Sequence, residues 1–221
     1  MKVIICAGGI APSQKLLLTE LNCNEETIVI AADGGANYLY NYRIIPHYLI
    51  GDEDSITPTA LDFMLQNKVI RKRYPSNKDF TDGRLAFDLA FTLQPDSITI
   101  FGGTLGARLD HLLGIFGLLN LALIRKIPTK LKDDYQTVML YDRNFTIQQP
   151  SGSKFSLQAY SDKVTNLTIK EAKFPLNSYL LTLGSDLTIA NETADTPTKI
   201  TFDNGKILLF LYNHSSTDNN R

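Results

Sequence analysis

The first half of the chain repeats one pattern: a short, continuously apolar run, then a polar turn, then a segment with helical spacing. Such runs occur at 2–8, 27–33, 47–52 and 96–103. A strand followed by a helix, repeated, is typical of a parallel sheet with crossover helices. Runs that are apolar throughout are typical of strands buried on both faces. We therefore expect residues 1–130 to form an α/β domain with a mainly parallel sheet and flanking helices.

The second half consists of short strand-like runs separated by turn residues, without convincing helical spacing. This pattern predicts a small all-β sandwich or barrel over residues 136–213. Asn204-Gly205 lies between two apolar runs and predicts a hairpin, because both central residues of a type I′ turn need positive φ. The segment 124–136 is charged and contains a proline, so we expect it to be a linker between the two domains.

Composition excludes several classes of protein. The chain has 22 Lys and Arg against 23 Asp and Glu, a net charge of −1, so no basic excess is available to bind nucleic acid or an anionic membrane. Two cysteines cannot form a disulfide framework, and the three histidines lack the spacing of a zinc site. The N-terminal apolar run is too short for a signal peptide, and no run is long enough for a spanning helix. We expect a cytoplasmic protein.

Aspartates gather where the predicted strands end and the next helices begin. Ligands of a parallel α/β sheet bind beyond the carboxyl ends of its strands. We therefore expect six aspartates to converge on one edge of the sheet: Asp33, Asp52, Asp54, Asp79, Asp82 and Asp110.

Asp52 and Asp54 are two positions apart, so in an extended segment they project to the same side while Glu53 faces away. Two carboxylates so close repel each other unless a cation lies between them. Mg²⁺ is suited to this position, because it prefers oxygen ligands and is often shared with substrate phosphates. The alternative is a solvated acidic turn. The other aspartates at the same edge favour the metal site.

The segment "FGGTLGAR" places Gly102, Gly103 and Gly106 behind a predicted strand, where they permit a tight turn and close approach to a ligand. The following helix offers unpaired N–H groups to a phosphate, and Arg108 adds a forked donor. The segment matches neither a Walker A loop nor a GxGxxG fingerprint. The alternative is a simple turn.

The other pieces also have structural explanations. Gly34 and Gly35 of "ADGGAN" can turn the chain into a helix capped by Asp33, and Thr81 is suited to an N-cap position with Asp82 at the positive end of its helix. For His111, at a helix start beside Asp110, a structural role or mere proximity is expected rather than catalysis. No serine, histidine and acid arrangement stands out, so nucleophilic hydrolysis gets little support.

Taken together, "ADGGAN", "LIGDEDSI", "KDFTD" and "GGTLGARLDH", in this order and at these separations, resemble the thiamine pyrophosphokinase (thiamine diphosphokinase) family over nearly the whole chain. The resemblance implies an N-terminal α/β catalytic domain that binds the nucleotide, and a C-terminal β-sandwich for thiamine binding and dimerisation. It also implies transfer of the diphosphoryl group of ATP to the hydroxyl of thiamine, with Mg²⁺, giving thiamine diphosphate and AMP. A homodimer with thiamine bound between the subunits is implied as well.

The resemblance also implies roles for individual residues. The metal ligands would be Asp52, Asp54 and Asp82. The residues at the reacting phosphates and the thiamine hydroxyl would be Asp82, Asp110 and Arg108, with Asp82 or Asp110 as proton acceptor. ATP and its phosphates would contact Asp33, Gly34, Gly35, Asn37, Lys78, Asp79, Thr81, Gly103, Thr104, Gly106 and Arg108. Thiamine would contact Ala190 and Asn191.

The chain departs from the family pattern at three positions. Glu53 stands where the pattern Gly-Asp-Phe-Asp-Ser has an aromatic residue, and its charge either adds to the metal pair or faces outward. Ala107 replaces a glycine before Arg108, and Ala190 replaces a serine. These departures support one alternative function, a non-catalytic sensor of thiamine or nucleotide. A second alternative predicts the same aspartate cluster: another metal-dependent enzyme, such as a nucleotidyltransferase or a pyrophosphokinase with another acceptor.

Overall fold

The computed structural model describes the chain apart from residues 24, 76–78, 105–108 and 214–221. The chain forms two compact units, Met1–Asp134 and Tyr135–Arg221. The domains expected from the sequence were 1–130 and 136–213.

The N-terminal unit is built on a sheet with the strand order β6-β5-β1-β2-β3-β4. Each neighbouring pair in this order is parallel, which confirms the α/β class with a parallel sheet. The strands are β1 (Lys2–Cys6), β2 (Thr27–Ala32), β3 (Tyr48–Gly51), β4 (Ile70–Arg73), β5 (Ser97–Phe101) and β6 (Thr129–Lys132).

Two of these strands were not expected. The sequence of β4 is IRKR and all four of its residues are exposed, so an edge strand formed here without the apolar run that marks a buried strand. The sequence of β6 is TKLK, and it lies inside the segment 124–136 that we expected to be a linker. That expectation was wrong for 129–132, because backbone pairing with β5 needs no apolar pattern.

In the part of this unit that the structure describes, five helices connect the strands: α1 (Gln14–Leu21), α2 (Gly35–Asn41), α3 (Pro58–Gln66), α4 (Asp82–Thr92) and α5 (Leu109–Ile124). The side chains of Ser13, Thr57 and Thr81 cap the first turns of α1, α3 and α4 by accepting a backbone N–H bond. The N-cap expected at Thr81 is therefore confirmed. The cap expected at Asp33 is wrong, because α2 has Gly34 as its N-cap residue and no side-chain bond there.

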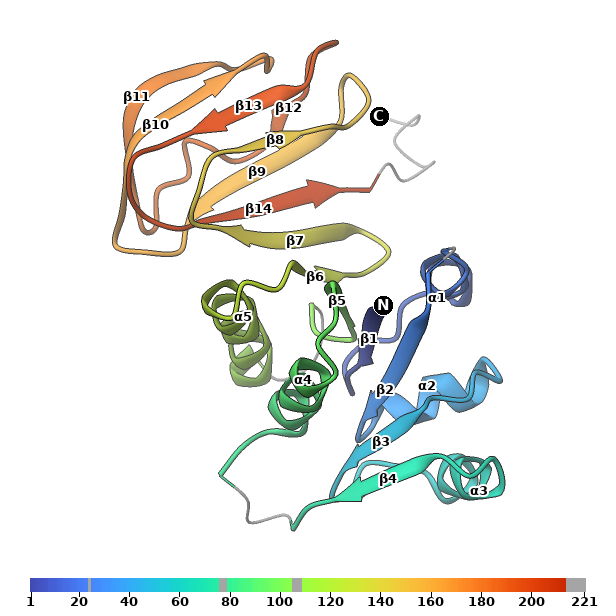
Figure 1. The fold of residues 1–221 in the computed structure, drawn as a ribbon. Coiled ribbons are helices and arrows are strands. Elements are labelled where there is room, and N and C mark those ends of the chain that lie inside the picture. The colour runs from blue at the N-terminus through green and yellow to red at the C-terminus, as the bar shows by residue number, and fades with distance from the viewer. Residues whose placement is uncertain (24, 76–78, 105–108, 214–221) are drawn as a thin grey trace. The chain divides into compact units, whose positions relative to one another are not determined.

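The helices cover both faces of the sheet, with α1, α2 and α3 on one side and α4 and α5 on the other (Figure 1). On the first side, Leu17, Leu39 and Met64 pack with Ile4 and Leu49 in one buried cluster. Strand β1 has β2 on one side and β5 on the other, so the chain reverses its direction of travel across the sheet at this strand. Such a point is where parallel sheets bind ligands.

The C-terminal unit consists of two antiparallel sheets, which confirms the expected β-sandwich. One sheet has the order β12-β9-β14-β7 and the other β11-β10-β13-β8. A core that includes Phe155, Leu157, Ile169, Ile200 and Leu209 is formed by side chains of both sheets. The strands are β7 (Gln136–Tyr141), β8 (Phe145–Ile147), β9 (Lys154–Ala159), β10 (Lys163–Lys170), β11 (Leu176–Thr182), β12 (Asn191–Glu192), β13 (Thr198–Thr201) and β14 (Ile207–Tyr212).

The hairpin expected at Asn204-Gly205 is wrong. The strands on either side, β13 and β14, belong to different sheets, so the turn carries the chain from one sheet to the other. Gly205 has a φ of 115°, whereas Asn204 is not among the residues with positive φ, which excludes a type I′ turn. Asn204 instead forms a bridge with Thr165. Hydrophobic burial on both sheets outweighed the local turn preference.

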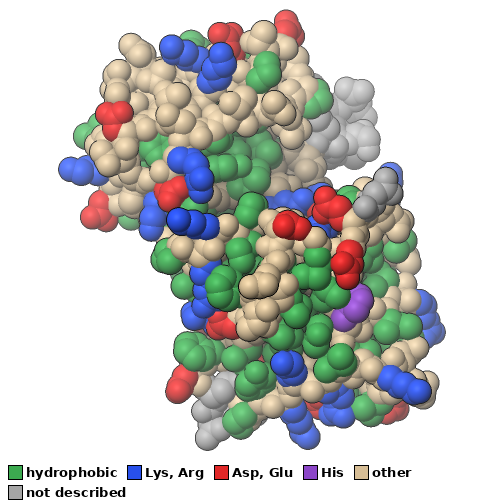
Figure 2. Space-filling view, in the orientation of Figure 1, with side chains coloured by type: hydrophobic (Ala, Val, Ile, Leu, Met, Phe, Trp, Pro, Cys, Tyr) green, Lys and Arg blue, Asp and Glu red, His purple; other side chains and the backbone are tan. Residues whose placement is uncertain are grey.

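On the face drawn in Figure 2, basic and acidic side chains are interspersed over the surface of each unit. Within the described part of the chain, no helix is long and apolar enough to cross a membrane.

Candidate active site

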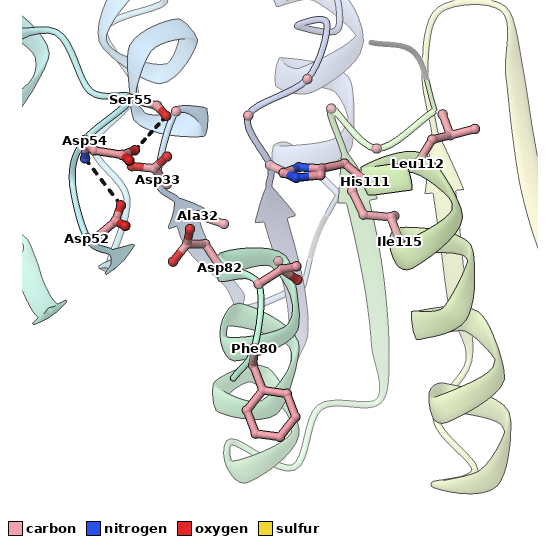
Figure 3. Close-up of a pocket in the computed structure, with 18 of the residues that line it drawn as sticks. Ala32, Asp33, Asp52, Asp54, Ser55, Phe80, Asp82, His111, Leu112 and Ile115 are labelled. Atoms are coloured by element: carbon pink, nitrogen blue, oxygen red, sulfur yellow. Dashed lines mark hydrogen bonds between the residues drawn. The ribbon is translucent and has the colours of Figure 1, made fainter. Parts of the chain in front are cut away.

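A pocket of about 800 Å³ lies at the carboxyl ends of the strands of the N-terminal unit. Five of the six aspartates that the sequence analysis singled out line it: Asp33, Asp52, Asp54, Asp79 and Asp82. Asp110, the sixth, is exposed in the first turn of α5 and is not among the described residues that line the pocket. Figure 3 shows the four carboxylates of Asp33, Asp52, Asp54 and Asp82 on one side of the pocket and His111 extending from α5 on the other.

The register of the sheet explains why these side chains meet. Cys6 is opposite both Ala31 and Phe101, and Ala32 is opposite Ile50, so β1, β2, β3 and β5 end at a similar level. The backbone hydrogen bonding between β2 and β3 continues one residue past the end of β2, because the Asp33 N–H donates to the carbonyl of Ile50 at 2.7 Å. Asp33 therefore leaves the sheet next to the end of β3.

The carboxylates of Asp33, Asp52 and Asp82 form a cluster in which one oxygen from each lies within 4.8 Å of the others. Gly51 makes this approach possible. A Cβ at this position would lie 3.0 Å from the Cβ of Asp33 and 3.2 Å from Oδ1 of Asp82, and the φ of 145° also favours glycine. The three carboxylates, from the residues just after β2 and β3 and from the start of α4, thus converge across a residue without a side chain.

Burial raises the pKa of Asp33; a hydrogen bond from Ser55 opposes this, and the charge of Asp82 raises it further. Oδ1 of Asp33 is buried and has no hydrogen-bond partner among the described residues. A buried acceptor without a donor, beside two further carboxylates, is the arrangement that a cation stabilises. Three carboxylate oxygens within 4.8 Å of one another suit Mg²⁺, which prefers oxygen ligands.

Asp54 is placed differently from Asp52. Its Oδ1 accepts a hydrogen bond from Oγ of Ser55 at 2.9 Å, and its N–H donates to Oδ1 of Asp52 at 3.4 Å. The expected extended conformation is wrong, because Glu53 has a φ of 70° and the chain turns here. Asp54 lines the pocket but lies outside the group of three described above. Its role as a metal ligand stays a prediction.

Glu53 does not add its charge to the metal cluster. Its side chain is 7% exposed and receives two hydrogen bonds from the Arg71 guanidinium, at 2.9 and 2.7 Å. The Nε of Arg73 lies 3.7 Å from Oε2 of Glu53. The first departure from the family pattern is therefore a carboxylate neutralised by arginines of β4.

The remaining sequence candidates divide into groups. Gly34, Thr81 and Gly103 line the pocket. Asn37 instead bonds the backbone of the loop between β3 and α3. Its Nδ2 donates to the carbonyl of Ser55 at 2.8 Å, and its Oδ1 accepts from the N–H of Thr57 at 2.9 Å. Gly35 and Thr104 are buried and are not among the described lining residues. Three further candidates, Lys78, Gly106 and Arg108, lie outside the described residues, as does Ala107, the second departure from the family pattern.

Several lining residues were missed by the sequence analysis. The loop after β1 contributes Ala7, Gly8, Gly9 and Ile10, and α5 contributes His111, Leu112 and Ile115. Two adjacent glycines directly after the first apolar run were an available signal for that loop. For His111 we expected a structural role or mere proximity rather than catalysis; it faces the pocket (Figure 3), and its role there stays a prediction. A helix-start histidine gives no sequence signal that separates these two cases.

The two thiamine-binding candidates lie in the C-terminal unit. Ala190 has a φ of 60°, and its N–H donates to Oγ of Ser156 at 2.9 Å. Asn191 is buried. Its Nδ2 donates to the carbonyl of Phe174 at 2.8 Å, and its Oδ1 accepts from the N–H of Phe174 at 3.1 Å. Within this unit Asn191 therefore holds the exposed Phe174 in place.

The comparisons with known proteins agree with this geometry. A family model described as the catalytic domain of thiamin pyrophosphokinase matches residues 19–131, and one described as its vitamin B1 binding domain matches residues 144–207. Thiamine pyrophosphokinase of Bacillus subtilis (strain 168) is 34% identical over 214 residues, which are 95% of this chain and 98% of that protein.

Solved structures give the same assignment. The crystal structure of the Bacillus subtilis thiamine pyrophosphokinase has a TM-score of 0.85 with 30% identity, over 97% of this chain and 100% of that one. The thiamin pyrophosphokinase of Geobacillus thermodenitrificans has a TM-score of 0.81 with 25% identity, over 98% and 99% of the two chains. Over both of its units, in sequence and in fold, the chain belongs to the thiamine pyrophosphokinase family.

Proposed function

We propose that this chain transfers the diphosphoryl group of ATP to the hydroxyl of thiamine, giving thiamine diphosphate and AMP. The observation that supports this most directly is the cluster of Asp33, Asp52 and Asp82 in the pocket of a family member. Transfer of phosphoryl-type groups depends mainly on positioning and on neutralising the charge of the phosphates. ATP and Mg²⁺ also fit the cytoplasmic location expected from the sequence.

Mg²⁺ would be held by Asp33, Asp52 and Asp82, with Asp54 beside them. When bound, the ion neutralises phosphate charge and orients the reacting groups. The glycines of the loop after β1 and Gly103 leave backbone close to the pocket, where N–H groups can bind phosphate oxygens. Lys78 and Arg108, from the sequence analysis, would add positive charge at the same phosphates.

The hydroxyl of thiamine must lose a proton as its oxygen attacks the β-phosphorus and AMP leaves. Of the two acceptors proposed from the sequence, Asp82 lines the pocket and Asp110 does not. Asp82 is therefore the better placed of the two, and it would accept the proton on a carboxylate oxygen. His111 also faces the pocket and is a further group with which a substrate can bond.

A homodimer with thiamine bound between subunits is part of the proposal. The C-terminal unit exposes apolar side chains around the Ala190-Asn191 segment, including Phe174, Leu187 and Ile189. A second subunit would cover such side chains. Analytical ultracentrifugation of the purified protein tests this part, with a monomer as the contrary result.

Purified protein incubated with ATP, Mg²⁺ and thiamine is expected to release AMP and thiamine diphosphate, measured by chromatography. A sensor would bind without forming AMP. An enzyme with another acceptor would form AMP only when a different alcohol is supplied, which a screen of alcohols and nucleotides detects.

Asp52→Asn and Asp54→Asn test the metal site separately. Each is expected to lower AMP formation by about 100-fold or more while circular dichroism shows an intact fold. Wild-type turnover in Asp54→Asn would show that Asp54 is not a ligand and would leave the cluster of three as the metal site.

A further inference from the structure

Glu53 lies between the two aspartates of the turn that follows β3, and its backbone is in the left-handed region with a φ of 70°. Residues other than glycine seldom adopt this conformation unless their surroundings hold them in it. The side chain is only 7% exposed, although the turn is at the surface. A nearly buried carboxylate in an uncommon backbone conformation needs a partner, and β4 supplies it.

The partner is Arg71, whose guanidinium contacts the Glu53 carboxylate with two bonds. Nε donates to Oε1 at 2.9 Å and Nη2 donates to Oε2 at 2.7 Å. Two N–H bonds from one guanidinium fix both the distance and the direction of a carboxylate. The Arg71 side chain is 31% exposed and the Glu53 side chain only 7% exposed. The glutamate side of the ion pair is therefore largely protected from solvent.

Strand β4 is well placed to hold the turn. Arg71 is opposite Leu49 in the parallel pair of β3 and β4, and the N–H of Tyr74 donates to the carbonyl of Gly51 at 3.0 Å. The backbone of β4 thus holds the end of β3, and the ion pair holds the turn beyond it at a second point.

The ion pair has a direct consequence for Asp52. The Glu53 side chain bonds Arg71 of β4, and the carboxylate of the neighbouring Asp52 lies with those of Asp33 and Asp82. Neither Glu53 nor Arg71 is among the described residues that line the pocket, so neither is placed to touch a substrate there.

We propose that Glu53 is a positioning residue: its ion pair with Arg71 holds the turn 51–54 in the conformation that places the Asp52 carboxylate in the metal cluster. The inference rests on the metal site of the proposed function. In this chain an ion pair takes the place of the aromatic residue that the family pattern has at this position.

A positioning role and a purely electrostatic role of the ion pair predict opposite effects on cation binding when Arg71 is replaced. If the pair acts only through charge, loss of Glu53 weakens cation binding, whereas loss of the positive Arg71 strengthens it. If the pair positions Asp52, loss of either partner weakens cation binding, because the turn is released in both cases. The sign of the Arg71 effect therefore separates the two.

The test uses Glu53→Gln, Arg71→Gln and a matched control, Asp88→Asn. Asp88 bonds Arg84 at 2.8 Å and Arg125 at 2.7 Å in the same unit, and none of the three is among the described residues that line the pocket. Binding of Mn²⁺ alone, a stand-in for Mg²⁺ at carboxylate sites, is measured by electron paramagnetic resonance, and thermal unfolding is followed in parallel. AMP formation is measured as a function of Mg²⁺ concentration.

Glu53→Gln and Arg71→Gln are each expected to raise the Kd for Mn²⁺ about 10-fold and to raise the Mg²⁺ concentration needed for turnover. Asp88→Asn is expected to unfold at a lower temperature with the wild-type Kd. An unchanged Kd in both variants, or tighter binding in Arg71→Gln, overturns the positioning role. A wild-type protein that binds no Mn²⁺ overturns the metal site itself together with the inference.

Discussion

The carboxylates of Asp33 and Asp82, which come from the end of β2 and the start of α4, meet within 4.8 Å across Gly51. Besides burial, the charge of Asp82 raises the pKa of Asp33, because the two carboxylates repel each other. A cation bound between them would relieve this repulsion.

Asp33→Asn is expected to stabilise the protein without metal at neutral pH. The pKa of Asp33 is raised by burial in the fold from its ordinary value of 3.8, so the folded state holds this proton more tightly than the unfolded state. The resulting stability is present below pH 3.8 and is lost as the pH rises through the folded pKa. The variant should unfold at higher urea concentration than wild type at pH 7 and show no such difference near pH 3.

The same variant is expected to lose its response to Mg²⁺. Wild type should unfold at a higher temperature when Mg²⁺ is added, because a ligand that binds only the folded state stabilises it, whereas Asp33→Asn should not. Asp142→Asn, which changes an exposed carboxylate of the C-terminal unit, is the control and should respond as wild type does. A variant that is less stable than wild type without metal at pH 7 would contradict the prediction.

Glu20→Gln is expected to destabilise the N-terminal unit by about 3 kcal/mol at pH 7, since a buried lysine loses its counter-charge. Lys2 is 6% exposed and lies 3.0 Å from the carboxylate of Glu20, while Lys130 and Lys132 each lie 2.8 Å from it. Burial alone would raise the pKa of Glu20, but hydrogen bonds from the three lysines hold it well below its ordinary value of 4.5.

The pH dependence of that effect follows from the lowered pKa. The stability that Glu20 contributes is present above pH 4.5 and is lost as the pH falls toward its folded pKa. Urea unfolding should therefore show a difference between wild type and Glu20→Gln that shrinks in acid. Asp96→Asn removes the exposed ion pair with the N-terminus and should leave the midpoint unchanged at pH 7. Equal stability of wild type and Glu20→Gln at pH 7 would refute a structural role for the cluster.

Gly35→Ala is expected to destabilise the fold by about 4 kcal/mol or more. A Cβ at this position would lie 1.9 Å from the carbonyl oxygen of Cys6, and both atoms belong to packed elements that cannot separate cheaply. Gly114→Ala in α5 is the control, because nothing lies within 4 Å of its Cβ position. It should stabilise the helix by about 0.5–1 kcal/mol. Urea unfolding measures both, and similar midpoints for the two variants would contradict the close approach.

One of the two thiols is expected to react quickly with a thiol reagent in the native protein. Cys23 is exposed, whereas burial raises the pKa of Cys6 to about 12, which leaves little thiolate at neutral pH. Absorbance with a disulfide reagent should show one fast thiol in buffer and two in urea. Cys23→Ser should remove the fast phase, and a fast phase that persists in this variant would place Cys6 at the surface.

The sequence by itself determined the class of both units and the identity of the aspartates in the pocket. Runs such as "IVIAA" are apolar along their whole length, which is typical of a strand covered on both faces. The position of Asp33 and Asp52 directly after two such runs placed them at one edge of the sheet, because parallel strands end together. These are local properties, and they can be read from spacing alone.

Only the tertiary structure decided which groups touch. Strands β4 and β6 have polar sequences and exist because neighbouring strands pair with them, and the turn at Asn204 joins two sheets because burial outweighed its local preference. Glu53 could equally have faced the aspartates, and it bonds Arg71 instead because β4 runs beside β3. Contacts between residues far apart in the chain depend on the register and direction of whole elements, which no short stretch of sequence encodes.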